Sequence, residues 1–217
     1  EDYNSLLAHV ASNTKKSNTI AFLFVETDLL LNETVEHLRK SGFQSIVIID
    51  SQTIRRADYD DPNISSAPLK FHRDSDVAAI LNMAIKALPG RWLFYSFVGE
   101  FLFFPFGDQR SIADATTFLA EERRSSTICT VVDLYTDDLK RDPDGVSIEH
   151  AHFDQVGYYA TQRYDGSEPL DRQSDVFGGL KWRFEEHVLW EQRRINRVSL
   201  FKADPAVTLD QELLFTE

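Results

Sequence analysis

A chain of 217 residues with 42% hydrophobic residues is long enough to bury a full core and too apolar to be disordered. Its formal net charge of −12 argues against a protein that binds nucleic acid non-specifically, because such proteins need a basic surface. Cys129 is the single cysteine, which excludes an internal disulfide, and no apolar run reaches membrane-spanning length, so we expect a cytoplasmic protein without a transmembrane segment.

The first part of the chain alternates strand-like and helix-like segments. Residues 19–25 and 45–49 are continuous apolar runs, which are typical of strands buried on both faces of a parallel sheet. Between them, residues 32–41 place apolar side chains at helical spacing, and Gly42 marks the end of that helix. A polar, Asp-rich loop follows, and residues 69–73 are predicted as a short third strand.

The next segments continue this alternation. Residues 76–88 have the clearest helical periodicity in the chain. The aromatic stretch 92–102 predicts a buried strand that ends at a site. A further helix is expected over residues 111–124, with Ser111 and Asp114 forming a capping box at its start.

A strand predicted over residues 127–135 completes an α/β pattern, for which we expect a mostly parallel sheet with helices on both faces. Beyond residue 136 the alternation stops, and no clear periodicity returns until about residue 176. We therefore predict one domain over residues 1–217. It would consist of a nucleotide-binding core over 1–135 and an irregular C-terminal elaboration over 136–217.

Polar residues follow the predicted strands at the edge where ligands bind in open parallel sheets. They are Glu26, Asp50, Ser51, His72, Arg73, Glu100, Asp133 and Tyr135. An edge rich in carboxylates suits ribose hydroxyls, a base edge or a metal ion. The alternative is that these residues cap helices and solvate loops.

Several of these segments resemble the nucleotide-binding core of family-two glycosyltransferases, which have the Rossmann-like GT-A fold. In one bacterial branch, the metal-binding strand reads approximately W-x-x-x-x-D-x-D-E-F-L, and residues 92–102 (WLFYSFVGEFL) are similar in the Trp, the Glu-Phe-Leu and the spacing. Residues 131–135 (VVDLY), 177–184 (FGGLKWRF) and 197–202 (RVSLFK) resemble later segments of that branch. The likeness covers roughly residues 19–202.

The resemblance implies a nucleotide-sugar donor and a glycan or other hydroxyl compound as acceptor. It implies that Glu26 and Asp50 lie near the nucleotide, with Asp50 at the base or ribose, and that Glu100 flanks the diphosphate. The other donor-binding residues that it implies are Gly178 and Gly179, for close backbone approach, and Lys181 and Arg183, for phosphate.

The catalytic carboxylates are expected from the later part of the chain. Asp133 occupies the position where the resemblance implies an acceptor-side or catalytic carboxylate, and Glu185 can supply a general base. Two alternatives remain open: Glu185 is an exposed helix charge, and residues 181–202 form a solvated amphipathic helix.

The chain departs from the family pattern at the metal site. Magnesium and manganese prefer carboxylate oxygens, but the two acidic positions are Phe97 and Gly99 here. Phe97 cannot ligate a metal, and Gly99 offers only its backbone, so we predict no metal ligand in this chain. Magnesium or manganese would enter only with the nucleotide-sugar, and lysine and arginine would otherwise have to neutralise the leaving diphosphate.

Three functions follow as hypotheses. The first is a glycosyltransferase-like protein that transfers or binds a sugar from a nucleotide-sugar. The second is a non-catalytic relative that binds a nucleotide, a glycan or a protein, and the third is an unrelated α/β enzyme with its site in the C-terminal third. His150 and His152 could chelate a metal from one face of a strand, although a role as surface histidines is the favoured interpretation.

Overall fold

The computed structural model describes residues 3–14, 16–50, 59, 61–72, 76–211, 213 and 215–216. Ser51 and Arg73, which were expected at the ligand-binding edge, lie outside the described residues. The chain divides into two compact units, one made of residues 1–127 and 198–217 and the other of residues 128–197. Within the described ranges, no helix is both long and apolar enough to span a bilayer.

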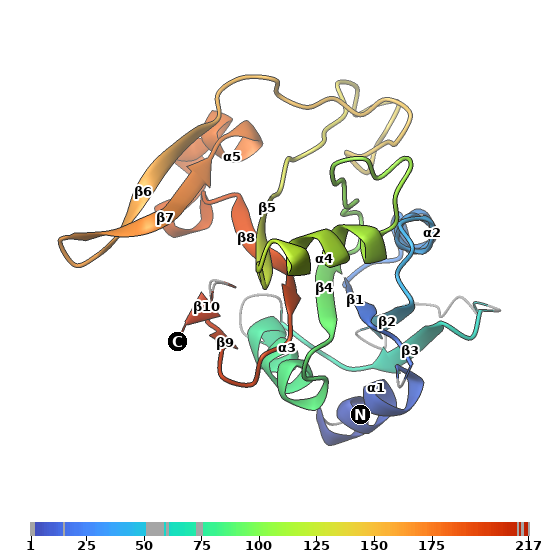
Figure 1. Ribbon diagram of the computed structural model, residues 1–217. Helices are drawn as coiled ribbons and strands as arrows, with labels where there is room; N and C mark the ends of the chain where they lie inside the picture. The colour runs from blue at the N-terminus through green and yellow to red at the C-terminus, as the bar shows by residue number, and fades with distance from the viewer. Residues whose placement is uncertain are drawn as a thin grey trace. The chain divides into compact units, whose positions relative to one another are not determined.

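A six-stranded sheet with the order β3-β2-β1-β4-β8-β5 organises the fold (Figure 1). Its strands are β1 (Thr19–Val25), β2 (Ser45–Asp50), β3 (Ile64–Pro68), β4 (Trp92–Phe97), β5 (Ser126–Thr130) and β8 (Asn196–Lys202). The four strands β3, β2, β1 and β4 are parallel, and β8 runs antiparallel to β4. The predicted α/β fold with a mostly parallel sheet is therefore confirmed.

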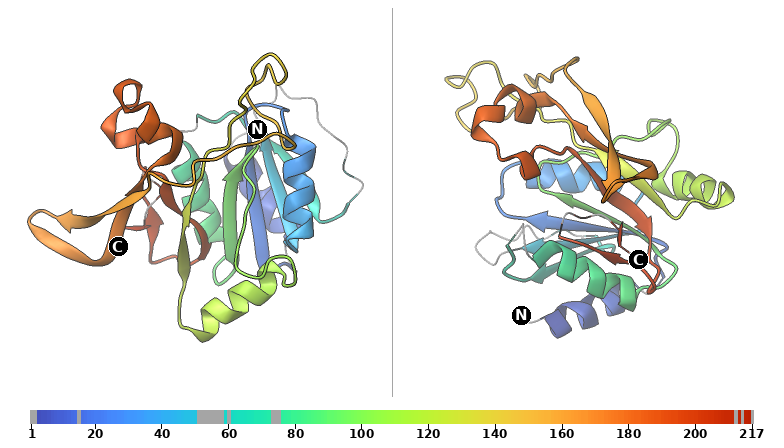
Figure 2. Two further views of the ribbon diagram at one scale, coloured as in Figure 1. Left: turned by 90° about the horizontal axis from the view of Figure 1, so that it is seen from above. Right: turned by 90° about the vertical axis from the view of Figure 1, so that its left-hand side faces the viewer.

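Helices cover both faces of this sheet, as Figure 2 shows edge-on. Four helices belong to the first unit: α1 (Tyr3–Asn13), α2 (Leu31–Lys40), α3 (Asp76–Ala87) and α4 (Ile112–Glu121). One apolar core joins α1 and α3 to strand residues such as Phe22 and Tyr95. A second core joins α2 and the start of α4 to the alternate strand residues, such as Leu23 and Phe94. Successive residues of β1, β2 and β4 thus pack into opposite cores, which is why these three strands are mostly apolar.

The start of α4 confirms the predicted capping box. Ser111 Oγ accepts a hydrogen bond from the Asp114 backbone N–H, and the Asp114 carboxylate accepts the Ser111 N–H at 2.8 Å. Both contacts satisfy backbone donors that a helix start leaves without partners.

The second unit is built around a β-hairpin, drawn in orange in Figure 1. Strands β6 (Tyr159–Asp165) and β7 (Glu168–Phe177) pair antiparallel and are followed by the short helix α5 (Gly179–Arg183). Two 3-10 turns, Glu185–His187 and Trp190–Gln192, lead from there to β8. In the first unit, β9 (Thr208–Leu209) and β10 (Phe215–Thr216) form a small separate ladder.

Two predicted strands are shorter than expected, because β4 ends at Phe97 and β5 at Thr130, and three other sequence predictions were wrong. The third strand is Ile64–Pro68 and not 69–73, because its pairing with β2 starts at Ile64 opposite Ile46. Residues 181–202 do not form an amphipathic helix, because α5 ends at Arg183 and β8 occupies the end of that range. His150 and His152 do not share a strand; His152 makes only an isolated bridge to Tyr135.

Candidate functional site

The strand order reverses between β1 and β4. From β1 the sheet grows through β2 and β3 in one direction, and the chain then returns to place β4 on the other side of β1. In open α/β sheets, such a reversal leaves a crevice outside the carboxyl ends of the two strands, where ligands bind. The residues that follow β1 and β4, beginning with Glu26 and Val98, are therefore the first candidates for a site.

The turn after β4 is closed by its own hydrogen bonds. Glu100 Oε2 accepts the Phe97 backbone N–H at 2.9 Å, and the Glu100 N–H donates to the Phe97 carbonyl at 3.0 Å. The N–H of Gly99 donates to Thr34 Oγ1 at 2.9 Å, and this hydroxyl donates in turn to the Leu30 carbonyl at 2.7 Å. The turn is thus attached to the first turn of α2.

This turn does not fit a divalent metal. The Phe97 side chain is 3% exposed and packs in the core, with its ring centroid 5.7 Å from that of Phe24. Gly99 has no side chain, and Glu100 uses one carboxylate oxygen to hold the Phe97 N–H. Among the residues that the structure describes, no three His, Cys, Asp or Glu side chains come together in a way that could hold a metal ion.

Asp50 ends β2 as a buried carboxylate. Asp50 is only 4% exposed, and Ser66 Oγ of β3 donates a hydrogen bond to Asp50 Oδ2 at 3.0 Å. The Asp50 carbonyl accepts the Leu69 N–H at 2.7 Å, which fixes the strand end. The sequence did not indicate a role for Ser66, because the polar composition of residues 61–68 gives no sign of the strand to which Ser66 belongs.

The edge beside the strand reversal is acidic. Every charged residue in the segments 26–33 and 98–107 is a carboxylate: Glu26, Asp28, Glu33 and Glu100. The first three are exposed and Glu100 is partly exposed. Like charges at this edge repel a diphosphate unless a cation accompanies it or basic side chains reach it.

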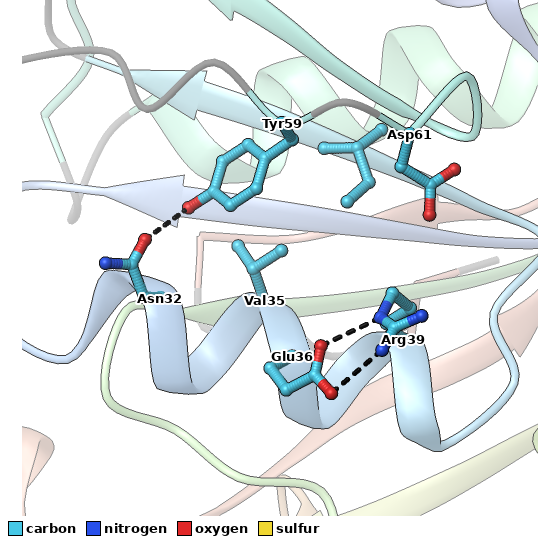
Figure 3. A pocket seen from close by; sticks show the side chains of 7 residues that line it. Asn32, Val35, Glu36, Arg39, Tyr59 and Asp61 are labelled. Carbon is cyan, nitrogen blue, oxygen red and sulfur yellow. Dashed lines mark hydrogen bonds and ion pairs between the residues drawn. The ribbon is translucent and has the colours of Figure 1, made fainter.

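A hollow of about 230 Å³ lies between α2 and a segment that ends at the start of β3 (Figure 3). Its lining is Asn32, Val35, Glu36, Arg39, Tyr59, Asp61 and Ile64. Arg39 donates to both oxygens of Glu36, at 2.8 and 2.9 Å, and lowers the pKa of Glu36 to about 2. Tyr59 Oη donates to Asn32 Oδ1 at 3.1 Å. None of the predicted site residues lines this hollow. Four of its polar side chains bond in pairs within the lining, and Asp61 accepts the Asn63 backbone N–H at 2.8 Å.

In the second unit, Gly178 and Gly179 lie against the ring of Tyr158. A Cβ on Gly178, whose φ is +152°, would clash with Tyr158 Cδ1. A Cβ on Gly179, at φ +61°, would meet Tyr158 Oη at 3.4 Å. The close approach that these glycines permit is made here by the Tyr158 ring.

The predicted phosphate-binding residues have partners within the second unit. Arg183 donates to Asp154 Oδ1, and its guanidinium carbon lies 5.3 Å from the centroid of the Tyr135 ring. The ammonium group of Lys181 donates to the Arg194 carbonyl at 3.4 Å. A phosphate would have to compete with these contacts, and the role predicted for both residues stays a prediction.

The two predicted catalytic carboxylates lie in different surroundings. Glu185 is exposed and forms an ion pair with Arg193 at 3.2 Å. Asp133 is partly buried and, with Asp154, raises the pKa of Tyr158, although burial of the phenol is the larger cause. Within the described part of the chain, the buried Tyr158 Oη has no hydrogen-bond partner. Of the predicted residues, Asp133, Gly178, Gly179 and Arg183 therefore gather around Tyr158, Asp154 or both.

Comparison of the chain with protein-family models and with curated proteins finds no match. The site must therefore be interpreted from its own geometry and chemistry.

Proposed function

We propose that this protein binds a nucleotide-sugar in the manner of GT-A glycosyltransferases. The observation that carries the proposal is the strand reversal between β1 and β4, with Glu26, Asp50 and Glu100 at the carboxyl ends of β1, β2 and β4. Such a reversal in a parallel sheet is the general place for nucleotide binding in α/β proteins. The sequence resemblance at residues 92–102 supports the same edge.

Each strand end has a proposed role. Asp50, held by Ser66, is proposed to accept hydrogen bonds from the base or ribose. Glu26 follows the neighbouring strand β1 and is proposed to lie nearer to the diphosphate. Glu100 shapes the turn beside the diphosphate through its bond to the Phe97 N–H. Lys181 and Arg183, which belong to the second unit, stay the residues that the sequence resemblance implies for phosphate binding.

The proposed reaction is sugar transfer to a hydroxyl. A carboxylate takes the proton of the acceptor hydroxyl, and the oxygen attacks the anomeric carbon. The bond between that carbon and the diphosphate oxygen breaks, and the nucleoside diphosphate leaves with the bonding electrons. Asp133 is the better candidate for the base, because Glu185 is exposed and paired with Arg193.

A second candidate function is binding without transfer. It is favoured by the acidic edge at Glu26, Asp28, Glu33 and Glu100 and by the internal partners of Lys181 and Arg183. A protein with this charge arrangement could bind the base and ribose of a nucleotide without supplying the positive charge that stabilises the transition state of transfer.

Thermal unfolding in the presence of UDP-, GDP- and CDP-sugars tests the proposal. Each ligand is added once with manganese and once with EDTA. A ligand at roughly 100 times its Kd stabilises the folded state by about 2.7 kcal/mol, so a binder raises Tm measurably. We expect one nucleotide series to raise Tm in EDTA. Release of the nucleoside diphosphate in the presence of an acceptor separates transfer from binding, and no response to any nucleotide-sugar would refute the proposal.

A further inference from the structure

The strand β6 has an outer edge that is open to pairing. Among the described residues, β6 is hydrogen-bonded to β7 alone in a two-stranded sheet (Figure 1), and all of its residues are exposed except Arg163, which is partly exposed. A two-stranded ribbon by itself is only marginally stable in water, and an unpaired edge presents its backbone N–H and C=O groups to any further strand. The edge of β6 is therefore a candidate interaction surface.

Hydrogen bonds on the far side of β7 establish which residues of β6 face this edge. The Val176 N–H donates to Asn196 Oδ1 at 2.6 Å, and the Val176 carbonyl accepts the Ile195 N–H at 2.9 Å, so both backbone groups of Val176 face away from β6. In an antiparallel ladder, the residue opposite such a position also directs its N–H and C=O away from the partner strand. The residue opposite Val176 is Ala160.

The same alternation continues along β6. Gln162 is paired with Ser174, whose carbonyl accepts a side-chain amide at 3.0 Å on the far side of β7. Tyr164 is paired with Pro169, which has no N–H for the ladder. The backbone N–H and C=O of Ala160, Gln162 and Tyr164 therefore point to the outer edge. Within the part of the chain that the structure describes, no backbone hydrogen bond from outside the hairpin reaches these three residues.

Most of β6 is free of acidic residues. Residues 155–164 (QVGYYATQRY) contain no Asp or Glu and one basic residue, in a chain with 35 Asp and Glu and a formal net charge of −12. Two copies of so acidic a chain repel each other over most of their surfaces. They can approach closely where carboxylates are absent and the surface is exposed, and β6 meets both conditions.

The sequence of β6 is self-complementary in an antiparallel arrangement. When two copies of β6 pair about a two-fold axis at Gln162, the outward-facing residues of both copies meet, because Gln162 lies opposite its own copy and Ala160 lies opposite Tyr164. Residues paired in this way exchange both of their backbone hydrogen bonds. Like charges directly opposite each other would destabilise the pairing, and this register has none. The remaining facing pairs are Thr161 with Arg163 and Tyr159 with Asp165.

We infer that β6 is a self-association surface, through which two copies of the chain pair antiparallel and form a continuous sheet with the order β7-β6-β6-β7. The pairing satisfies the outward backbone groups of both edges and places no carboxylate opposite another. The edge of one short strand buries less area than a permanent dimer does, so we expect a reversible dimer with a Kd on the order of 100 μM.

Sedimentation and amide hydrogen exchange, each followed as the protein concentration rises, test this inference. We expect the mean mass to rise from that of a monomer toward that of a dimer between about 10 μM and about 1 mM. Over the same range, exchange of the Ala160, Gln162 and Tyr164 amides should slow about fivefold, because pairing engages them. The Thr161 amide faces β7 by the same alternation and is the internal control, whose exchange should stay unchanged.

Charge variants at the two-fold axis test the register. Gln162 is exposed, and its side chain donates to the Leu170 carbonyl within the hairpin at 3.0 Å. Gln162→Lys and Gln162→Glu each place like charges opposite each other and should weaken self-association about fivefold or more. An equimolar mixture of the two variants should associate at least as tightly as the unsubstituted protein, because Lys then faces Glu. The same pair of substitutions at Gln173, an exposed glutamine of β7, is the matched control and should leave self-association unchanged.

Proline variants separate the outer edge from the hairpin itself. Gln162→Pro removes an outward N–H and retains the backbone bonds between β6 and β7, because proline is tolerated where the N–H of an edge strand faces outward. The variant should keep the circular dichroism spectrum of the folded protein and lose the dimer. Thr161→Pro removes an N–H that faces β7 and should disrupt the hairpin.

The outcomes decide between a second copy and other occupants of this edge. A protein that stays monomeric up to about 1 mM leaves the edge to a strand of a different protein and overturns the inference. Association that is equally tight in every Gln162 variant lies elsewhere on the surface and also overturns it. Weakening by both charge variants without recovery in their mixture contradicts pairing about Gln162, whereas recovery supports it. None of these measurements involves a nucleotide-sugar, so the proposed function is tested separately.

Discussion

Glu100 and Phe97 are joined across the turn that ends β4: the Phe97 backbone N–H donates to Glu100 Oε2 at 2.9 Å. The Phe97 side chain points into the core, where it is 3% exposed, so the bond fixes the strand end between the core and the edge of the sheet. A carboxylate that occupies its own turn in this way is a structural cap. The Glu100 carboxylate therefore has a structural role in a turn whose other side chains do not fit a metal.

Replacing Glu100 should lower stability through the loss of this cap. Glu100→Ala removes the acceptor and should lower the free energy of unfolding by about 1 kcal/mol, the usual net value of such a bond. Glu100→Gln retains an acceptor oxygen and should cost less. Urea denaturation measures both changes, and equal stability of the two variants would contradict the capping role.

Phe97→Asp, which introduces the acidic residue that the glycosyltransferase pattern has at this position, should unfold the protein and not create a metal site. It removes a ring that packs against Phe24 and buries a charge, for an expected cost of about 4 kcal/mol or more. Phe97→Leu keeps the position apolar and should cost about 1.5 kcal/mol or less. Circular dichroism and urea denaturation distinguish them. A folded Phe97→Asp variant that binds manganese would show that Phe97 is not needed in the core.

Ser66→Ala should destabilise the end of β2. The variant takes a donor away from Asp50, which is almost fully buried, and a hydrogen bond to a charged group contributes about 1.5–3 kcal/mol. Ser65→Ala, one residue earlier and on the opposite face of β3, is the matched control and should change stability less. If chemical denaturation gives the same midpoint for both, Ser66 does not support Asp50.

The capping box of α4 should make stability depend on pH in the acidic range. The pKa of Asp114 is lowered by the hydroxyl and the backbone N–H of Ser111. Because the folded-state pKa lies below the unfolded value of about 3.9, the stabilisation is fully present above that pH and is lost as pH falls through the folded-state pKa. Ser111→Ala removes the hydroxyl donor and should flatten this part of the Tm profile between about pH 5 and 2. An unchanged profile would contradict the assignment, and Thr117→Ala on the same helix is the control.

Local patterns in the sequence predicted much of the first unit. The strands β1 and β2 and the helix α3 were predicted because the apolar run or helical periodicity of each segment is enough to identify it. Ser111 and Asp114 form a capping-box pattern that spans only four residues. The strand Ile64–Pro68 was missed because it contains two serines and ends in proline, and its pairing with β2 outweighs those weak propensities.

The second unit was much less accessible from the sequence. The strand β6 is exposed along nearly its whole length, so it has no alternation of apolar and polar residues to detect. The cluster around Tyr158 brings together residues that are far apart in the chain: Asp154 meets Arg183, and Tyr158 meets Gly178. The resemblance to glycosyltransferases implied site roles for Asp133 and Arg183. No local sequence pattern indicated that Tyr158 and Asp154 lie close to these two residues.

Calorimetric titration with nucleotide-sugars tests the central claim most directly. The protein is titrated with UDP-, GDP- and CDP-sugars in EDTA and again in manganese. The account predicts saturable binding of one nucleotide series with the same Kd in both buffers, because the turn formed by Phe97, Gly99 and Glu100 supplies no metal site. Binding that appears only with manganese would contradict the account of this turn, and the absence of binding in both buffers would contradict the proposed function.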